Sequence, residues 1–346
     1  MALLELSGIT AGYDKNIILK DFNLSVEKGE FVSLLGSSGC GKTTCLRLIA
    51  GFSEPMAGKM TFNGQDYTHV PLHKRNFGFV FQSYALFPHL TVFDNVAFGL
   101  KMRKMDKATI KKEVMHMLEV VDLKGFENRF PREMSGGQRQ RVALARALVI
   151  KPDLLMFDEP LSNLDAKLRV KMRVEIRRLQ QELGFTAIYV THDQEECFAI
   201  SDKVAIMNKG VIEQMDTPSE IYNNPKTEFI ARFVGFENFF DLERTGACQF
   251  KTKNGVAIET TADHAAGATL KGCIRPGDVT VAPAGADLPN ALTGKVMVST
   301  FLGQHNQLNV LTDIGEFVVS CDQNQVFPVG ETVTLSLAAN KIILID

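Results

Sequence analysis

A glycine-rich loop at residues 36–44 limits the possible fold more than any other part of the sequence. It reads GSSGCGKTT, and it lies between an apolar run at 31–35 and an apolar helix start at 45–50. The pattern G-x-x-x-x-G-K-[ST] between a strand and a helix is typical of a loop that binds nucleotide phosphates. Its glycines let backbone N–H groups turn inward around an anion, and the helix N-terminus adds positive potential. The predicted phosphate-binding residues are Gly36, Ser37, Ser38, Gly39, Cys40, Gly41, Lys42, Thr43 and Thr44.

Three side chains of this loop have separate expected properties. Lys42 is expected to reach the β- and γ-phosphates, and the hydroxyl group of Thr43 is expected to bind Mg²⁺. The side chain of Cys40 is not needed for the phosphate contacts, because the backbone makes them. Its thiol lies beside Lys42 and a helix N-terminus, so it is predicted to be exposed and reactive, whereas Cys45 is predicted to be buried.

Three further short apolar runs, at 77–81, 154–157 and 187–190, alternate with helical patterns. Such runs predict buried parallel strands, and ligands bind beyond the carboxyl ends of these strands. Polar residues stand at those ends, namely Gln82, the pair Asp158 and Glu159, and His192. Paired acids after a buried strand recur as a Mg²⁺ ligand and its neighbour. Taken alone, Gln82 and His192 are better explained as strand-end caps.

The chain is long enough for two domains, and its pattern changes near residue 240. Helical periodicity occurs at 110–121 and at 168–183, where Gly184 is a natural C-cap. The later region has short Val- and Thr-rich segments with turn signals, such as 294–298, and these predict antiparallel β units. The expected connection is the stretch 224–241.

Composition excludes several classes of protein. The net charge of -2 argues against a strongly basic nucleic-acid binder. We find no apolar run long enough to span a bilayer and no signal-peptide pattern at the start. The six scattered cysteines form no C-x-x-C pair, so neither a zinc site nor a disulfide framework is expected. A basic helix face is interpreted as solvated, and it comprises Lys167, Arg169, Lys171, Arg173, Arg177 and Arg178.

Residues 134–141, MSGGQRQR, begin another helix 23 residues before Asp158, counted from Ser135. This segment resembles the signature motif of ABC transporter ATPases, which usually begins with Leu where this chain has Met134. The resemblance extends over residues 1–235. It matches Gln82 to the Q-loop, residues 162–165 to the D-loop and His192 to the switch histidine, and it puts Tyr13 where the family stacks an aromatic ring on adenine. The family more often has Ala where this chain has Asn163.

The resemblance implies a P-loop NTPase domain of the α/β class, with a mostly parallel sheet and antiparallel β and helical subdomains. It also implies that two copies of the chain pair head to tail. The signature end, Ser135, Gly136, Gly137 and Gln138, then closes over the γ-phosphate of ATP held by the other copy. Ser135 is a good N-cap, and the two glycines leave backbone N–H groups open to an anion.

The same resemblance implies the catalytic roles. Glu159 polarises the attacking water, and His192 contacts the γ-phosphate. Asp158, Thr43 and Gln82 arrange the Mg²⁺ shell. Asp165 connects the two sites across the dimer, although a plain helix N-cap is an alternative role for this residue, and both roles are compatible.

Two further segments resemble importer ATPases. Residues 82–92 are similar to the segment that receives the coupling helix of a permease, with Phe87 and Leu90 expected to be exposed, and ordinary core is the alternative. Residues 210–222 and 273–279 are similar to the class with a C-terminal β-barrel domain of the TOBE type, here 236–346. That class handles maltose, polyamines, iron(III), sulfate, molybdate or phosphonates.

The chain is therefore predicted to power solute import from the cytoplasmic face of the membrane, as a peripheral ATPase with ATP and Mg²⁺. Its expected partners are a second copy, permease subunits and, indirectly, an extracytoplasmic solute-binding protein, but no nucleic acid. The cargo is predicted to be a polyamine or iron(III). The alternative is a soluble ABC-type ATPase with a non-transport target, which would normally need tandem ATPase domains or a long coiled coil, and the sequence shows neither. A GTPase is disfavoured because residues 208–211, NKGV, lack the acid of N-K-x-D.

Overall fold

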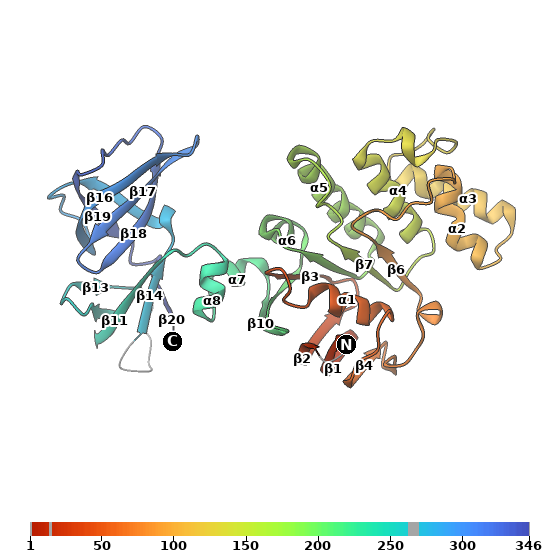
Figure 1. The fold of residues 1–346 in the computed structure, drawn as a ribbon, viewed down its shortest axis with the longest axis horizontal. Helices are drawn as coiled ribbons and strands as arrows, with labels where there is room; N and C mark the ends of the chain where they lie inside the picture. Colours follow the sequence, from red (N-terminus) through yellow and green to blue (C-terminus); the bar gives the residue numbers. More distant parts are fainter. Residues whose placement is uncertain (1, 14–15, 262–269, 346) are drawn as a thin grey trace. The chain divides into compact units, whose positions relative to one another are not determined.

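The computed structural model describes residues 2–13, 16–261 and 270–345. The chain divides into two compact units, Met1–Glu220 and Ile221–Asp346, and each is described here by itself (Figure 1). The sequence pattern predicts a boundary after residue 235, and that position stays a prediction.

The centre of the first unit is a six-stranded sheet of order β10-β9-β3-β8-β7-β6. The pairs β9–β3, β3–β8, β8–β7 and β7–β6 are parallel, and β10 is antiparallel to β9. Alternate residues of β7 belong to two different apolar clusters, so this strand is buried on both faces. The four predicted parallel strands are thus confirmed. The strand bounds are β3 (Phe31–Gly36), β6 (Phe77–Val80), β7 (Leu154–Asp158), β8 (Ala187–Thr191), β9 (Lys203–Asn208) and β10 (Val211–Asp216).

A second, antiparallel sheet of order β2-β1-β4-β5 contributes to one of these clusters. Its strands are β1 (Ala2–Tyr13), β2 (Asn16–Glu27), β4 (Ala57–Phe62) and β5 (Gln65–Asp66). Apolar residues of β1 and β2 share this cluster with residues of β3, β7 and the helix α1 (Lys42–Ala50). This packing anchors the phosphate loop, because the loop joins β3 directly to α1.

The other cluster contains the helical part of the first unit. The helices α2 (Val92–Met102), α3 (Lys107–Val120) and α4 (Gly136–Leu148) contact one another and lie side by side (Figure 1). The helices α5 (Ala166–Leu183) and α6 (Gln194–Ile200) also contact each other. Gly184 ends α5 in the left-handed conformation with φ of 65°, as its sequence position predicts. The short 3₁₀ turns of this unit are η1 (Leu72–Lys74) and η2 (Pro131–Glu133).

The second unit begins within α7 (Pro218–Asn223), continues through α8 (Glu228–Phe233), and is then built from strands. Two five-stranded antiparallel sheets, β13-β12-β11-β14-β20 and β15-β19-β16-β17-β18, share one apolar core. This arrangement confirms the predicted all-β region, although α8 lies in the expected connection. The remaining bounds are β11 (Asn238–Gly246), β12 (Gln249–Lys251), β13 (Ala257–Glu259), β14 (Leu270–Ile274), η3 (Pro276–Asp278), β15 (Val279–Pro283), β16 (Ala291–Phe301), β17 (His305–Thr312), β18 (Gly315–Asp322), β19 (Thr332–Leu337) and β20 (Ile343–Ile345).

Among the described residues, no helix combines the length and the apolar character that crossing a bilayer requires.

Candidate active site

The phosphate loop runs from the last residue of β3 to the first residue of α1. A Cβ atom on Gly36 would lie 2.4 Å from the carbonyl oxygen of Met207, so the neighbouring strand leaves no room for a side chain. Gly39 and Gly41 have φ angles of 80° and 108°, which L side chains rarely adopt. Gly41 is also the N-cap of α1. The glycines of the motif are therefore required by the backbone, and the loop presents the N-terminus of α1 to an anion.

Lys42 lies inside this loop rather than on its surface. Its Nζ atom donates to the carbonyl oxygens of Gly36, at 2.8 Å, and of Ser37, at 2.9 Å. A cavity of about 500 Å³ opens beside it. Its lining residues are Ile18, Ser38, Gly39, Gly41, Lys42, Thr43, Thr44, Glu159 and His192. The structure thus gathers the predicted loop and two predicted catalytic residues around one cavity, and it adds Ile18, which no sequence pattern marks.

Thr43 and Asp158 meet next to this cavity. The Oγ1 atom of Thr43 donates to Oδ1 of Asp158 at 3.2 Å. Burial raises the pKa of Asp158, and the hydrogen bond from Thr43 partly opposes this effect. Hydroxyl and carboxylate oxygens are the ligands that Mg²⁺ prefers, and Mg²⁺ usually completes its shell with water and phosphate oxygens. In residues 2–13, 16–261 and 270–345 no cluster of three His, Cys, Asp or Glu side chains could hold a metal alone. The donor set therefore suits a Mg²⁺ ion that arrives with a nucleotide.

Glu159 and His192 form the second pair at the cavity. The Oε2 atom of Glu159 lies 3.3 Å from Nδ1 of His192, and the two residues come from the ends of neighbouring strands β7 and β8. Glu159 has a φ angle of 44°, while its backbone N–H donates to the carbonyl oxygen of Val190 at 2.9 Å. Strained backbone of this kind concentrates at functional sites, where the surrounding structure holds it in place.

Gln82 is tied to the D-loop. Its Nε2 atom donates to Oγ of Ser162 at 3.1 Å, and its carbonyl oxygen accepts from Nδ2 of Asn163 at 2.8 Å. The hydroxyl group of Ser162 donates in turn to the carbonyl oxygen of Glu159 at 2.9 Å. Asn163, where the resembling family more often has Ala, therefore makes a hydrogen bond that Ala could not make.

The signature segment forms a capped helix start. The Oγ atom of Ser135 accepts from the backbone N–H of Gln138 at 3.3 Å, and Oε1 of Gln138 accepts from the backbone N–H of Ser135 at 2.9 Å. A Cβ atom on Gly137 would lie 2.9 Å from Cδ1 of Leu168, so α4 and α5 approach closely here. None of the residues from Ser135 to Gln138 is among the described lining of the nucleotide cavity. Within one chain, the N-terminus of α1 borders the cavity, whereas the N-terminus of α4 does not.

Gln82 and Asp158 are not among the residues that line the cavity, and Tyr13 and Asp165 also lie outside its lining. Tyr13 ends β1 with 44% of its surface exposed, as a stacking platform requires. Asp165 is the N-cap of α5, and its Oδ1 atom accepts from the backbone N–H of Leu168 at 2.9 Å. The capping role of Asp165 is confirmed, whereas its role between two copies stays a prediction.

Three sequence predictions about exposure need correction. Cys40 is 4% exposed and lies with its Sγ atom 3.7 Å from Nζ of Lys42, so the predicted exposure of this thiol is wrong. Cys45 is buried, as predicted. Phe87 and Leu90 are half-buried rather than exposed, because Phe87 packs on Phe98 with ring centroids 4.5 Å apart.

The basic face of α5 is also only partly solvated. Lys167, Lys171 and Arg178 are exposed, but Arg169, Arg173 and Arg177 are partly or fully buried. These three arginines pair with acids on or next to α6, namely Asp193, Glu195, Glu196 and Asp202. Helical periodicity marks which residues face away from the apolar core, but it does not reveal a neighbouring acidic helix.

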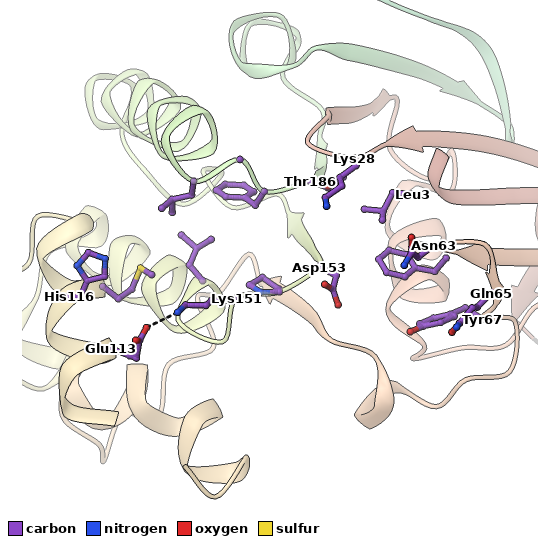
Figure 2. Close-up of a pocket in the computed structure, with 17 residues that line it drawn as sticks. Leu3, Lys28, Asn63, Gln65, Tyr67, Glu113, His116, Lys151, Asp153 and Thr186 are labelled. Atoms are coloured by element: carbon purple, nitrogen blue, oxygen red, sulfur yellow. Dashed lines mark ion pairs between the residues drawn. The ribbon is translucent and has the colours of Figure 1, made fainter. Parts of the chain in front are cut away.

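A larger cavity, of about 760 Å³, is shown in Figure 2. Asp153 and Thr186, which line it, immediately precede β7 and β8. Glu113 and Lys151 form an ion pair across part of its lining, with Oε2 and Nζ 3.1 Å apart (Figure 2). The cavity lies at the amino ends of the strands, and it is therefore separate from the nucleotide cavity at the carboxyl ends.

Known proteins with similar sequences share both units. The family model for ABC transporter matches residues 19–162, and the model for TOBE domain matches residues 272–345. The spermidine/putrescine import ATP-binding protein PotA of Mesoplasma florum is 44% identical over 336 residues, which cover 96% of this chain and 95% of the relative. The Fe(3+) ions import ATP-binding protein FbpC of Rhizobium etli is 44% identical over 332 residues, with 95% and 93% covered.

Solved structures agree with these relatives. CbiO1 from Clostridium perfringens, part of an ABC transporter complex, has 28% identity and a TM-score of 0.61, and covers 64% of this chain and 91% of its own. A dimeric ATP-binding cassette in a post-hydrolysis state with ADP and phosphate has 32% identity and a TM-score of 0.55, with 62% and 98% covered. The chain therefore belongs to the ABC transporter family, as an ATP-hydrolysing import subunit that uses ATP with Mg²⁺ and carries a C-terminal TOBE domain.

Proposed function

We propose that ATP is hydrolysed in a composite site made by two copies of this chain placed head to tail. The observation that carries this proposal is the incomplete cavity. It contains the phosphate loop, Glu159 and His192, whereas the capped helix start at Ser135 lies outside its lining. A second copy would supply that helix end, whose free N–H groups suit the γ-phosphate.

Residues that line the cavity and residues outside its lining have distinct proposed roles. Lys42 neutralises the β- and γ-phosphates, and Thr43, Asp158 and Gln82 would hold Mg²⁺, which neutralises charge on the phosphate oxygens when bound. Glu159 orients the attacking water and accepts its proton. His192 keeps Glu159 in place through the contact at 3.3 Å and reaches toward the γ-phosphate. The Ser135–Gly137 end of the partner copy takes the place of an arginine finger.

Replacement of Glu159 tests the composite site. Glu159→Gln keeps the size of the side chain but cannot accept the proton, so we expect turnover to fall by about 10²–10⁴-fold while ATP binding is retained. Because ATP then stays between the two copies, size-exclusion chromatography with ATP should show a dimer that persists. Glu182→Gln, at an exposed position of α5, is the matched control and should behave as wild type. A Glu159→Gln protein that hydrolyses ATP at the wild-type rate would disprove the assignment.

We further propose that the chain is peripheral at the cytoplasmic face of the membrane, bound to permease subunits through the segment around Phe87. The half-buried ring of Phe87 packs on Phe98, and Phe87 lies five residues after Gln82. A permease helix bound at Phe87 would therefore be connected to the nucleotide site by a short stretch of chain. Co-purification from membranes with a tagged permease should detect the complex. Phe87→Asp should abolish co-purification while leaving ATP binding intact, and retention of the complex would place the permease elsewhere.

The cargo is proposed to be a polyamine, delivered by an extracytoplasmic solute-binding protein. Relatives named for spermidine and putrescine import support this, while an equally similar relative named for Fe(3+) import supports iron(III) as a second candidate. Reconstitution with the permease and binding protein in proteoliposomes distinguishes them. Spermidine-loaded binding protein should stimulate ATP hydrolysis and iron(III) should not; the reverse result would assign iron(III).

A further inference from the structure

His192 is held in place by its neighbours along the chain. Its own side chain is largely exposed and contacts Glu159. The residue before it, Thr191, accepts a hydrogen bond at Oγ1 from the backbone N–H of Asp193, at 3.0 Å. The position of the histidine is therefore set by how Thr191 and Asp193 are fixed.

Both neighbours are held by Glu196, Thr191 through its buried carboxylate and Asp193 through its backbone N–H. Its Oε2 atom accepts from Oγ1 of Thr191 at 2.8 Å and from the hydroxyl group of Tyr189 at 3.0 Å. Its backbone N–H donates to Oδ1 of Asp193 at 3.1 Å, which makes Asp193 the N-cap of α6. Burial raises the pKa of Glu196, and the hydroxyl groups of Thr191 and Tyr189 oppose this rise.

Arg169 connects this arrangement to the D-loop. Its Nη2 atom donates to the carbonyl oxygen of Leu164, the residue before Asp165, at 3.3 Å. Its Nη1 atom donates to Oδ2 of Asp193 at 3.3 Å, and its Nε atom lies 3.7 Å from Oε1 of Glu196. One guanidinium group thus contacts the residue before Asp165 and the residue after His192.

We infer that Arg169 is a positioning residue that couples the D-loop to His192. A guanidinium group is planar, and its donors have fixed relative directions, so a shift of the Leu164 carbonyl changes where Asp193 is held. The inference rests on the proposed roles of Asp165 at the partner copy and of His192 at the γ-phosphate. Contact between the partner copy and the D-loop would then change the position of His192 only when the dimer has closed. ATP hydrolysis would therefore follow closure of the dimer.

The same helix offers a matched control one turn further on. Arg173 is buried on α5, and its Nη1 atom lies 3.3 Å from Oε2 of Glu195 on α6. It therefore makes the same kind of contact between the same two helices. Glu195 is the acid that it contacts, and its hydrogen bonds reach neither the Leu164 carbonyl nor Asp193.

Steady-state ATPase assays of the full chain test the inference. Arg169→Met is expected to lower kcat about tenfold and to change KM for ATP by less than about twofold, because ATP contacts are untouched. Arg173→Met should stay within about twofold of wild type in both constants. Equal kcat values for the two variants would overturn the inference, since loss of any buried arginine between α5 and α6 would then have the same effect.

A double-mutant cycle with His192→Ala separates the inference from the function on which it rests. If Arg169 acts through His192, Arg169→Met should not reduce kcat further in a His192→Ala background. Multiplied losses would show that Arg169 acts by another route and would overturn the inference alone. Wild-type activity of His192→Ala would instead remove the proposed role of His192, and the inference with it.

A charge-conserving variant covers the case in which Arg169→Met does not fold. Arg169→Lys keeps the positive charge, but a single ammonium group cannot reproduce the directed donors of the guanidinium group. We expect a folded Arg169→Lys protein with kcat at least about threefold below wild type. A folded Arg169→Lys protein with wild-type kcat would overturn the inference.

Discussion

Single residues of the site work in pairs that bring together the ends of different strands. Thr43 lies in the first turn of α1, which the phosphate loop joins to β3, while Asp158 ends β7, Glu159 follows it, and His192 follows β8. Since the strands β3, β8 and β7 are neighbours in this order and run parallel, these ends meet at one edge of the sheet. The contacts Thr43–Asp158 and Glu159–His192 are consequences of that order.

Tyr13 provides a test at the scale of one residue. A stacking platform uses the face of its ring and reads no base edge, so Tyr13→Phe should be nearly silent. Tyr13→Ala should weaken ATP binding by about 1–3 kcal/mol, the range for stacking of a base on an aromatic ring. Nucleotide titration of the three proteins, followed by fluorescence of an ATP analogue, measures this. Unchanged affinity of the Ala variant would show that adenine binds away from Tyr13.

At the scale of elements, helix starts define this site more than helix interiors do. The helices α1, α4, α5 and α6 begin at the phosphate loop, the signature segment, the D-loop and the residue after His192. Side chains of Ser135, Asp165 and Asp193 cap three of these starts by accepting a backbone N–H. Capping residues thus fix the backbone at the positions that carry the chemistry.

Asp165 allows the cap of α5 to be separated from its proposed contact with the partner copy. Asparagine caps a helix about as well as aspartate, so Asp165→Asn should keep the melting temperature, whereas Asp165→Ala should lower stability by about 1 kcal/mol. If the charge of Asp165 also contributes to the contact with the partner copy, Asp165→Asn should still lower the ATPase rate. Thermal unfolding and ATPase assays of both variants are the measurements. A fully active Asp165→Asn protein would leave the cap as the role of Asp165.

Local patterns predicted the elements, but not all of their contacts. The four parallel strands and the helices α3 and α5 follow from apolar runs and periodicity, and the strand-end residues Gln82, Asp158, Glu159 and His192 follow from those strands. The burial of Cys40 and the pairing of Arg169 with Asp193 do not follow. Both depend on residues far along the chain that surround the side chain, and a one-dimensional pattern does not record such neighbours.

At the scale of the whole molecule, each unit has its own core. Two apolar clusters lie within Met1–Glu220, and a third lies within Ile221–Asp346. The start of the second unit is held by Arg275, whose guanidinium carbon lies 3.6 Å from the ring centroid of Tyr222 and 3.9 Å from that of Phe236. Both contacts lie within the second unit, which begins at Ile221.

Separate cores predict that the full chain unfolds in two transitions. ATP stabilises only the unit that binds it, by about 2.7 kcal/mol at a concentration 100 times Kd, so one transition should move to higher temperature and the other should not. Calorimetry of the full chain with and without ATP would measure both transitions.

Two core variants assign the transitions. Leu335→Ala removes a fully buried side chain from the third cluster and should lower only the ATP-insensitive transition, by about 2–5 kcal/mol of stability. Leu118→Ala, equally buried in the first unit, should lower only the ATP-sensitive one. Because both changes delete the same atoms, any difference between them comes from where each residue lies. A single transition that responds to ATP and to both variants would mean that the two cores unfold together, and that nucleotide binding in the first unit stabilises the TOBE domain as well.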